Sequence, residues 1–508
     1  MITTLNGSAL SRAKALPLAA LAGAVTVAGF APLSVFPVPL LTVALLIVLW
    51  RRAPSRRDAT LIGFCFGLGY FLVGVSWVYV SLHDFGGMPA PLAGSLTLLF
   101  CVYLALFPAI TGWLYHALGT CSLPATLAAL PALWTFTEWL RGWLFPWIAL
   151  GYAQVPASPL AGYMPIFGVY GATLLTVLTA ALVVQSVAAR ARRGYLVTTL
   201  IAIWVGGYGL AQVDWTHPEG EPVAVSLLQG NVPQDMKWRE DKIKSTLAAY
   251  RSLVAASNAR LIILPETALP LFLHDVPRDY LDDLAAHARA NRGDVLAGVP
   301  ERVDSHNYYN SVLSFGTAPT QTYRKSHLVP FGEFVPFKPV FGWFLEVAQI
   351  PLLDFARGAE TQQPLAVAGQ HVAVNICYED AFGAEIIRQL PQATLLANVS
   401  NVAWFGRSIA PQQHLQISQA RALETGRYML RATNTGMTAI IDQRGRVLQA
   451  APEFTAAVVS GDVQGYAGAT PYVRWGDIPI LVLALTLALL GGWLGLREAG
   501  NIGELPMR

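Results

Sequence analysis

The stretch His371-Val-Ala-Val-Asn-Ile-Cys-Tyr-Glu-Asp380 decides the fold predicted for the polar part of this chain. Its apolar residues predict a short buried strand over 372–376 that runs directly into Cys377. Apolar side chains at helical spacing then predict a helix over 381–390. A cysteine at such a junction lies at a sheet edge near the positive end of a helix, which favours the thiolate. Cys377 is therefore a candidate nucleophile, although most free cysteines are small buried hydrophobic residues.

The composition is that of a membrane protein. Of the 508 residues, 54% are hydrophobic and only 13% are charged, which is roughly half the charged share of a soluble protein. The mean hydropathy is +0.46. The net charge of +3 is uninformative as a total, and we expect no nucleic-acid partner. Cys377 is the only cysteine of the polar region, so a disulfide framework is not expected.

Apolar segments predict eight membrane spans. The first run, residues 15–50, would be about 54 Å long as one helix, against a hydrocarbon core of about 30 Å. We therefore expect it to form two short spans joined near Gly29-Phe-Ala-Pro32. The other spans are predicted at 59–82, 89–118, 123–140, 160–189, 195–213 and 478–496.

The distribution of basic residues predicts the orientation of these spans, because cytoplasmic loops carry an excess of Lys and Arg. The opposite set of short loops contains Arg141 alone. One set of alternate loops and tails contains Arg12, Lys14, Arg51, Arg52, Arg56, Arg57, Arg190, Arg192, Arg193, Arg497 and Arg508. We therefore expect both termini in the cytoplasm and the polar region on the periplasmic side of a bacterial inner membrane. Glu138 and Arg141 are interpreted as an interfacial ion pair, or alternatively as a contact to a lipid headgroup.

The polar region predicts an α/β domain. Strands are expected at 223–228, 261–264, 294–298, 308–315, 320–324, 372–376, 394–397, 437–441 and 456–461. Helices are expected at 239–257, 278–292, 381–390 and 411–425. The order predicts sheets covered by helices. We expect a seven-span region over 1–213, this domain over 214–477, and a last membrane helix with a cytoplasmic tail over 478–508.

Three polar residues that suit acyl-transfer chemistry follow predicted strands. Glu266 ends the apolar run Leu-Ile-Ile-Leu-Pro-Glu, Lys325 follows Thr-Tyr-Arg, and Cys377 follows Val-Asn-Ile. Glu333 comes shortly after Lys325. The ends of sheet strands are where α/β folds assemble catalytic groups. A thiol needs a base to become nucleophilic, and a lysine can stabilise the oxyanion formed on a carbonyl.

Each of these residues also fits a structural explanation. Glu266 would suit a helix cap, Lys325 and Glu333 a solvated ion pair, and Cys377 a core position. A Cys–His dyad is an alternative, with His327 as the partner; His371 starts the strand about 20 Å before the thiol and fits poorly. The histidines show no spacing typical of a metal site, so no metal and no cofactor are expected.

Glu266, Lys325 and Cys377, in this order and in these motifs, resemble the Glu-Lys-Cys triad of the nitrilase (carbon–nitrogen hydrolase) superfamily. With the predicted spans, the chain resembles the bacterial apolipoprotein N-acyltransferase family. Val402 departs from the family pattern, which has an acidic residue there. The resemblance extends through Glu138-Trp-Leu-Arg-Gly-Trp143, Gln229-Gly-Asn-Val-Pro-Gln234, Trp238, Pro265-Glu266-Thr267, the stretch from Lys325 to Glu333, Cys377-Tyr-Glu379, Asn398-Val-Ser-Asn401 and Ala403-Trp-Phe-Gly406.

The resemblance implies an αββα sandwich and the last step of lipoprotein maturation. An acyl chain would pass from a phospholipid, typically phosphatidylethanolamine, to the thiol and then to the α-amino group of S-diacylglyceryl-cysteine in an apolipoprotein. By resemblance, Glu266 is the base, Lys325 supports the oxyanion and Cys377 is the nucleophile. Glu333 would support Lys325. Three further residues would shape the site: Trp238, Tyr378 and Glu379.

The segment from Phe337 to Phe355 supports a lipid substrate independently. It is aromatic, broken by prolines and follows Glu333 closely, so we expect a loop at the membrane interface or at the acyl-chain entry. Core packing is the plainer explanation. Two other functions are open: a membrane-anchored amidase or nitrilase that releases its acyl group to water, and a transporter or lipid-binding protein with an inert outer domain. Intramembrane ionisable residues would argue for a transporter, and the first seven spans have almost none in their interiors.

Overall fold

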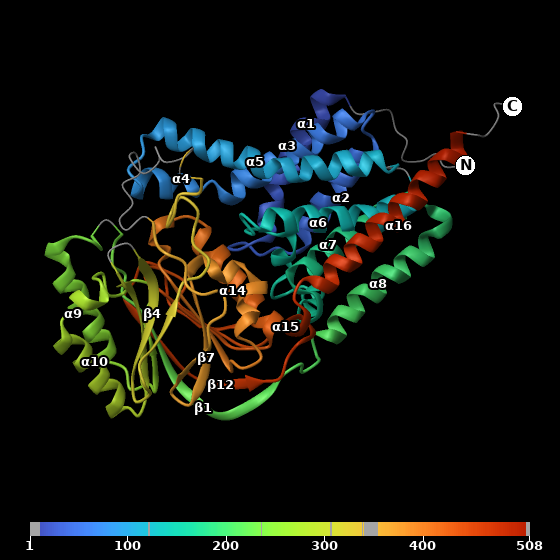
Figure 1. Cartoon of the computed structure of the whole chain (residues 1–508). Helices are drawn as coiled ribbons and strands as arrows, with labels where there is room; N and C mark the ends of the chain where they lie inside the picture. The colour runs from blue at the N-terminus through green and yellow to red at the C-terminus, as the bar shows by residue number, and fades with distance from the viewer. Residues whose placement is uncertain are drawn as a thin grey trace. The chain divides into compact units, whose positions relative to one another are not determined.

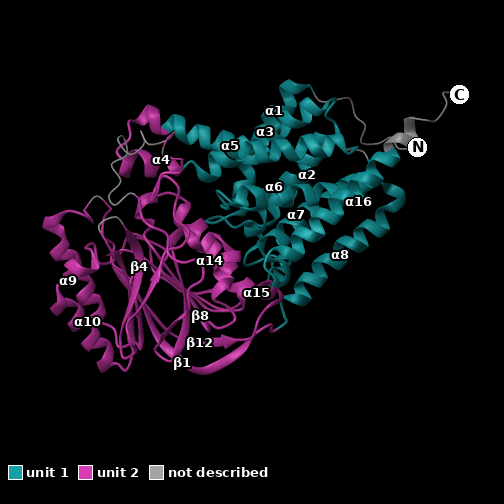
Figure 2. Ribbon diagram, in the orientation of Figure 1, with its two compact units in different colours: residues 1–76, 94–213, 475–508 teal, residues 77–93, 214–474 magenta. Residues whose placement is uncertain are grey.

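The computed structural model describes residues 11–119, 122–234, 236–304, 307–337, 339 and 354–503, and within a terminal helix the side chains only as far as residue 498. Two compact units are present (Figure 2). Unit 1 comprises residues 1–76, 94–213 and 475–508, and unit 2 comprises residues 77–93 and 214–474.

Unit 1 is built from apolar helices. Each predicted span overlaps a helix, and the first apolar run divides into two helices as predicted. Among the described residues, four segments are long and apolar enough to cross a membrane: Arg56–Val75, Ala90–Ala117, Pro159–Ala188 and Ile478–Glu498. The helices are α1 Arg12–Thr26, α2 Pro37–Arg51, α3 Arg56–Val75, α5 Ala90–Ala117, α6 Leu130–Gly142, α7 Met164–Ala188, α8 Arg193–Leu210 and α16 Ile478–Gly503.

The ion pair Glu138–Arg141 is buried among the protein atoms of unit 1. Both side chains are almost fully buried, with Nη2 of Arg141 3.8 Å from Oε1 of Glu138. Arg141 donates hydrogen bonds to the backbone oxygens of Phe145 and Trp147. Glu138 accepts a hydrogen bond from the backbone N–H of Leu150. The pair therefore holds the chain that leaves α6, because its charges satisfy backbone groups that no water reaches.

Unit 2 contains, within the described residues, two six-stranded sheets (Figure 1). The first has the order β12-β1-β2-β3-β4-β5, with β1, β2 and β3 parallel. The second has the order β11-β10-β9-β8-β7-β6, with β7, β8 and β9 parallel. The strands are β1 His217–Gln229, β2 Leu261–Ile263, β3 Asp294–Arg302, β4 Tyr308–Gly316, β5 Gln321–Arg324, β6 Leu365–Val367, β7 Gln370–Ile376, β8 Leu395–Ser400, β9 Met429–Thr433, β10 Ala439–Ile441, β11 Val447–Ala450 and β12 Ala457–Ala467.

The two sheets pack face to face, and helices cover their outer faces. One buried cluster joins residues of both sheets, including Leu227 and Ile263 from the first and Val374 and Val399 from the second. Helices α9 (Glu240–Ala255) and α10 (Arg278–Ala290) bury the outer face of the first sheet, and α14 (Ala410–Thr425) covers the second (Figure 1). This is the predicted αββα sandwich. Burial of each Val or Leu side chain contributes about 1.5–3 kcal/mol to the free energy of folding. The packed layer between the sheets therefore holds them at a fixed spacing.

The structure corrects the sequence prediction at several elements of unit 2. Strands β6, β9 and β11 were not predicted. The helix predicted over 381–390 is wrong, since the chain forms a 3-10 turn over Cys377–Ala381, a four-residue helix over Gly383–Ile386 and a second 3-10 turn over Ile387–Gln389. Helical spacing of apolar residues here reflects packing of short turns against β7 and β8, not one regular helix.

The chain between α3 and α5 belongs to unit 2, although the span predicted over 59–82 included its first residues. Nε1 of Trp77 donates to Oε1 of Gln413 at 3.1 Å. Oγ of Ser81 donates to the backbone oxygen of Trp404 at 2.8 Å. The Trp77 and Phe405 rings also meet edge to face, with centroids 4.7 Å apart. This segment is therefore packed on the turn Val402–Phe405, which follows β8.

Candidate active site

Glu266 lies just beyond the end of β2, as predicted, and its carboxylate is buried. Oε1 accepts a hydrogen bond from Nδ2 of Asn310 at 2.7 Å, and Oε2 accepts one from the backbone N–H of Asn401 at 2.7 Å. Asn310 belongs to β4 of the same sheet, whereas Asn401 follows β8 of the other sheet. The carboxylate is therefore fixed by hydrogen bonds from both sheets.

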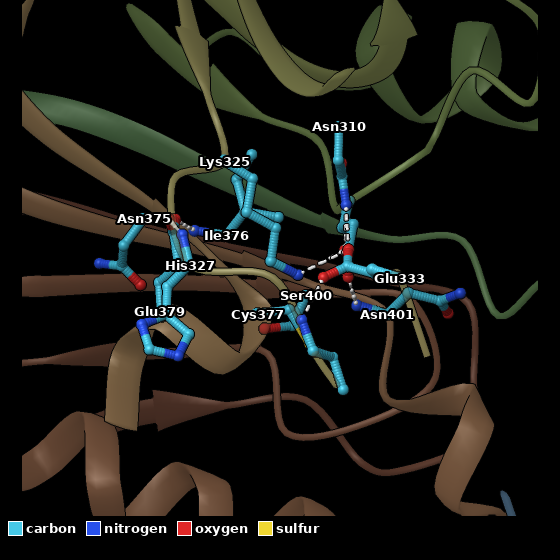
Figure 3. Close-up of polar contacts among 12 residues, drawn as sticks. Asn310, Lys325, His327, Glu333, Asn375, Ile376, Cys377, Glu379, Ser400 and Asn401 are labelled. Carbon is cyan, nitrogen blue, oxygen red and sulfur yellow. Dashed lines mark hydrogen bonds and ion pairs between the residues drawn. The ribbon is translucent and has the colours of Figure 1, made fainter. Parts of the chain in front are cut away.

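Lys325 lies directly after β5 and bridges the two predicted carboxylates. Its Nζ atom is 2.8 Å from Oε1 of Glu333 and 3.6 Å from Oε1 of Glu266. Nδ2 of Asn310 binds both carboxylates as well, at 2.7 Å to Glu266 and 3.0 Å to Glu333 (Figure 3). Burial alone would lower the pKa of Lys325, but Glu333 and Glu266 raise that pKa well above its usual value. The ammonium is thus a fixed positive charge, not a solvated one.

Cys377 follows β7 in a left-handed backbone conformation, with φ of 53°. Such a φ is uncommon outside glycine and marks a strained turn. Nδ2 of Asn398 donates a hydrogen bond to the Cys377 backbone oxygen at 3.2 Å, which holds this turn. Burial and the carboxylate of Glu266 raise the pKa of the Cys377 thiol to about 12, against smaller opposing effects of Lys325 and Arg431. The expectation that a helix terminus favours the thiolate is therefore wrong.

Cys377 is partly exposed, and its protonated thiol lies beside a buried carboxylate and a buried ammonium, so it can perform base-assisted nucleophilic attack. The thiol is neutral at physiological pH, so it must give up its proton during the reaction. Glu266 is the buried carboxylate whose charge acts on the thiol, and Lys325 is the neighbouring cation. The three predicted residues are thus brought together, although they come from three different strand ends.

Glu379 and Tyr378 lie in the 3-10 turn that begins at Cys377. The Glu379 carboxylate accepts hydrogen bonds from the backbone N–H groups of Ser326, His327 and Ile376. Burial raises its pKa, against the opposing effect of these donors. Glu379 therefore ties the chain beyond Lys325 to the nucleophile's turn. Tyr378 is buried and packs on Phe382, and Trp238 is half-buried in the loop after β1.

The alternative Cys–His dyad finds no support in the placement of the two histidines. Nδ1 of His327 is 3.0 Å from Oε1 of Glu385, and its ring stacks on Phe382 at a centroid distance of 3.7 Å. His371 is exposed at the start of β7, at the opposite end of the strand from Cys377. The carboxylate of Glu266, not His327 or His371, is therefore the candidate base.

Sequence reasoning missed several side chains that hold the site. The Asn310 side chain bridges the two carboxylates, the Asn398 side chain binds the backbone oxygen of Cys377, and the backbone N–H of Asn401 binds Glu266. Lys237 donates a hydrogen bond to the backbone oxygen of Glu266. Asn398 and Asn401 are the ends of the singled-out motif Asn-Val-Ser-Asn, so that motif was a usable signal. Val402 is buried beside it.

The proposed lipid-entry segment falls mostly outside the described residues. Residues 340–353, which include Trp343 and Phe344, are not described. At its start, Phe337 is 78% exposed. At its end, the backbone N–H groups of Asp354 and Phe355 bind the backbone oxygen of Glu333 at 2.8 Å. The segment is therefore attached directly to a residue of the catalytic cluster.

Comparisons with known proteins agree with this architecture. The family description "Apolipoprotein N-acyltransferase N-terminal domain" matches residues 22–182, and "Carbon-nitrogen hydrolase" matches residues 224–472. The chain is 56% identical over 483 residues to the apolipoprotein N-acyltransferase of Nitrosomonas europaea, covering 92% of this chain and 96% of that protein. It is 46% identical over 489 residues to the enzyme of that name from Chromobacterium violaceum, covering 95% of this chain and 94% of that protein. Identity of this extent leaves one conclusion: the chain belongs to the apolipoprotein N-acyltransferase family, whose catalytic domain is of the carbon–nitrogen hydrolase type.

Proposed function

We propose that this protein transfers an acyl chain from a membrane phospholipid, through a thioester on Cys377, to the N-terminal amino group of S-diacylglyceryl-cysteine in apolipoproteins. The observation that carries this proposal is the cluster of buried Glu266 and Lys325 with the partly exposed Cys377, in a chain whose relatives are named apolipoprotein N-acyltransferases. In this reaction the phospholipid is the acyl donor and the apolipoprotein amino group is the acyl acceptor.

In the first half-reaction, Glu266 accepts the thiol proton while the sulfur attacks the ester carbonyl of the phospholipid. Lys325 stabilises the oxyanion. The tetrahedral intermediate then collapses, the C–O bond breaks, and the leaving alkoxide of the lysophospholipid takes the proton from Glu266. Removing one oxyanion donor typically costs about 10²–10³ in rate, so Lys325 carries a large part of the barrier reduction. Glu333 and Asn310 keep Lys325 in place.

In the second half-reaction, the neutral α-amine of the diacylated acceptor attacks the thioester carbonyl. Glu266 takes a proton from the attacking nitrogen, the C–S bond breaks, and Glu266 passes the proton to the leaving sulfur, which restores the thiol and the carboxylate. An amide replaces the thioester, so no cofactor or metal takes part. Trp238, Tyr378 and Glu379 are proposed to shape the space that receives the substrates in turn.

The membrane arrangement is proposed from the apolar helices and the basic residues. Eight spans, with residues 1–213 and 478–508 in the membrane region, place both termini in the cytoplasm and residues 214–477 in the periplasm. The four long apolar helices and the shorter α2 support this arrangement. Phosphatidylethanolamine is the proposed donor, since the site faces a compartment where bilayer lipids are the available acyl esters.

Intact-protein mass spectrometry after incubation with phosphatidylethanolamine tests the proposal. We expect wild type and Cys65→Ala to gain the mass of one acyl chain, and Cys377→Ala to gain none. Cys65 is a matched control because it is a free cysteine in α3, outside the site. Addition of a diacylated lipopeptide should then remove the acyl mass and yield a triacylated product. Release of free fatty acid in place of that product would identify a hydrolase.

A further inference from the structure

A second lysine, Lys237, reaches the active site from the loop between β1 and α9. Its side chain is almost fully buried, with 2% of its surface exposed. Nζ of Lys237 donates a hydrogen bond to the backbone oxygen of Glu266 at 3.1 Å. The next residue, Trp238, is only half-buried. The loop therefore brings an ammonium group next to the base while leaving an aromatic ring near the surface.

The charges of the cluster show why a second cation matters. Glu266 and Glu333 are two carboxylates, and Lys325 is within 4 Å of both. One ammonium between two carboxylates leaves a net negative charge in a buried site. When the thiol gives its proton to Glu266, that carboxyl becomes neutral and the excess negative charge moves to the sulfur of Cys377. Lys237 brings the count to two cations and two anions.

The charged groups that face Lys237 come from several elements. Glu266 follows β2 and Cys377 follows β7, and both raise the Lys237 pKa. Lys325 follows β5 and contacts the carboxylates of both Glu266 and Glu333. Arg431 of β9 lowers the pKa of Cys377. Burial has the largest effect and lowers the pKa of Lys237 to about 8, so the side chain is mostly protonated at neutral pH.

We infer that Lys237 is an electrostatic positioning residue of the acyltransferase site, whose positive charge offsets the Glu266–Glu333 pair and stabilises the Cys377 thiolate as it forms. The inference rests on the proposed role of Cys377 as nucleophile. Lys237 acts through the base and the sulfur, and Lys325 supports the oxyanion.

A structural role for Lys237 is the competing explanation, because the same loop has a second anchor. Oε1 of Gln234 accepts a hydrogen bond from Nδ2 of Asn401 at 2.7 Å, and Asn401 in turn binds Glu266. Loss of either anchor loosens the loop, but only loss of Lys237 removes a charge. Gln234→Ala is thus the control for loop anchoring, and Lys244→Met, at an exposed position of α9, is the control for loss of a lysine.

The first experiment measures single-turnover acylation of Cys377 by phosphatidylethanolamine from pH 6 to 10, read by intact mass. We expect the wild-type rate to decline as the pH rises through about 8, where Lys237 loses its proton. Lys237→Met should be slower by at least about tenfold at pH 7 and should lack this decline. Lys237→Arg should recover most of the rate and shift the decline to higher pH, whereas Gln234→Ala should keep the wild-type pH profile. A Lys237→Met profile that matches wild type overturns the inference.

The second experiment needs no lipid. Iodoacetamide alkylation of Cys377 at pH 7, in a background with Cys65, Cys101 and Cys121 replaced by Ala, reports the thiolate fraction. Lys237→Met should alkylate several-fold more slowly than the background protein, and Lys244→Met at the same rate. An unchanged rate in Lys237→Met overturns the inference even if acylation fails for another reason. If Lys237→Met alkylates more slowly but wild type forms no acyl-enzyme with phosphatidylethanolamine, the role of Lys237 is upheld and the proposed lipid donor is rejected.

Discussion

Nδ2 of Asn398 lies 3.2 Å from the backbone oxygen of Cys377, so the strand beside the nucleophile's own strand holds the nucleophile's turn. Oδ1 of Asn398 is in turn bound by Nη1 of the buried Arg431 at 2.6 Å. Three adjacent parallel strands, β7, β8 and β9, are thus linked by side chains directly beneath the thiol. A left-handed cysteine persists only where its surroundings fix it, and these bonds supply that constraint.

Asn398→Ala should slow acylation by on the order of 10²-fold, because a displacement of the nucleophile by about 1 Å has that effect. Ser400→Ala is the matched control on β8. It removes one hydrogen bond to Oδ1 of Asn398 but leaves the bond to Cys377 in place. Single-turnover rates of the two variants should therefore differ by about tenfold or more. Equal rates would show that the turn keeps its geometry without Asn398.

Glu266→Gln should separate thiol ionisation from catalysis. The negative charge of Glu266 raises the pKa of Cys377, so its removal should lower that pKa and increase iodoacetamide alkylation at a fixed pH above 8. Acylation by phospholipid should nevertheless fall, since general-base catalysis contributes about 10²–10⁴-fold. Both rates are measurable by intact mass. A variant that alkylates more slowly than wild type would contradict the assigned sign of the interaction.

Lys237→Met should raise stability while it lowers activity. The folded-state pKa of Lys237 is lowered from 10.5 to about 8 by burial, and this difference corresponds to a cost on the order of 3 kcal/mol at pH 7. Because the folded state lowers the pKa of Lys237, the buried ammonium reduces the free energy of unfolding below about pH 8. This loss of stability disappears as the pH rises through 10.5, above which the lysine is also neutral in the unfolded chain. Thermal unfolding in detergent should show the variant more stable at pH 7, with the gap closing toward pH 10. A less stable variant at pH 7 would identify a mainly structural lysine.

Replacing Trp343 and Phe344 together with Ser tests the proposed lipid-entry segment. If aromatic side chains here meet the bilayer or guide acyl chains, turnover of phosphatidylethanolamine in vesicles should fall by about tenfold or more, as expected for loss of two buried aromatic contacts. Acylation by a short-chain, water-soluble ester should persist and serves as the control for an intact site. Unchanged phospholipid turnover in a folded variant would reject the segment's proposed role.

The positions of Glu266 and Cys377 were predictable because each follows an apolar strand. Glu266 and Cys377 end runs whose members are buried on both faces, which is typical of parallel strands between layers. Such runs are visible in sequence, and polar residues at their ends are easily noticed. Lys325 differs, because β5 has the mostly polar sequence Gln-Thr-Tyr-Arg, and the motif that Lys325 forms with Glu333 made it noticeable instead.

The sequence patterns did not predict the elements and site residues in which polar side chains are buried. Strand β9 contains Arg431, which is fully buried, so its sequence Met-Leu-Arg-Ala-Thr does not read as a core strand. Asn310 and Asn398 lie inside strands and take their roles from neighbours distant in sequence. Lys237 precedes a residue that was singled out, yet nothing local distinguishes it from a solvated lysine. The role of Lys237 depends on how the loop between β1 and α9 packs against Glu266, and the spacing of residues along the sequence does not show this packing.

The division of the catalytic groups between two sheets has a mechanical consequence. Glu266 and Lys325 extend from the first sheet, and Cys377 extends from the second. The separation of Glu266 and Cys377, between which we propose the proton transfer, therefore depends on the thickness of the hydrophobic layer between the sheets, where Ile263 and Val374 are fully buried. A close-packed layer deforms little, so it acts as a rigid spacer. Enlarging or trimming a side chain in that layer would change the reach of the base without altering any polar residue, and the acyltransferase would lose rate before it lost its fold.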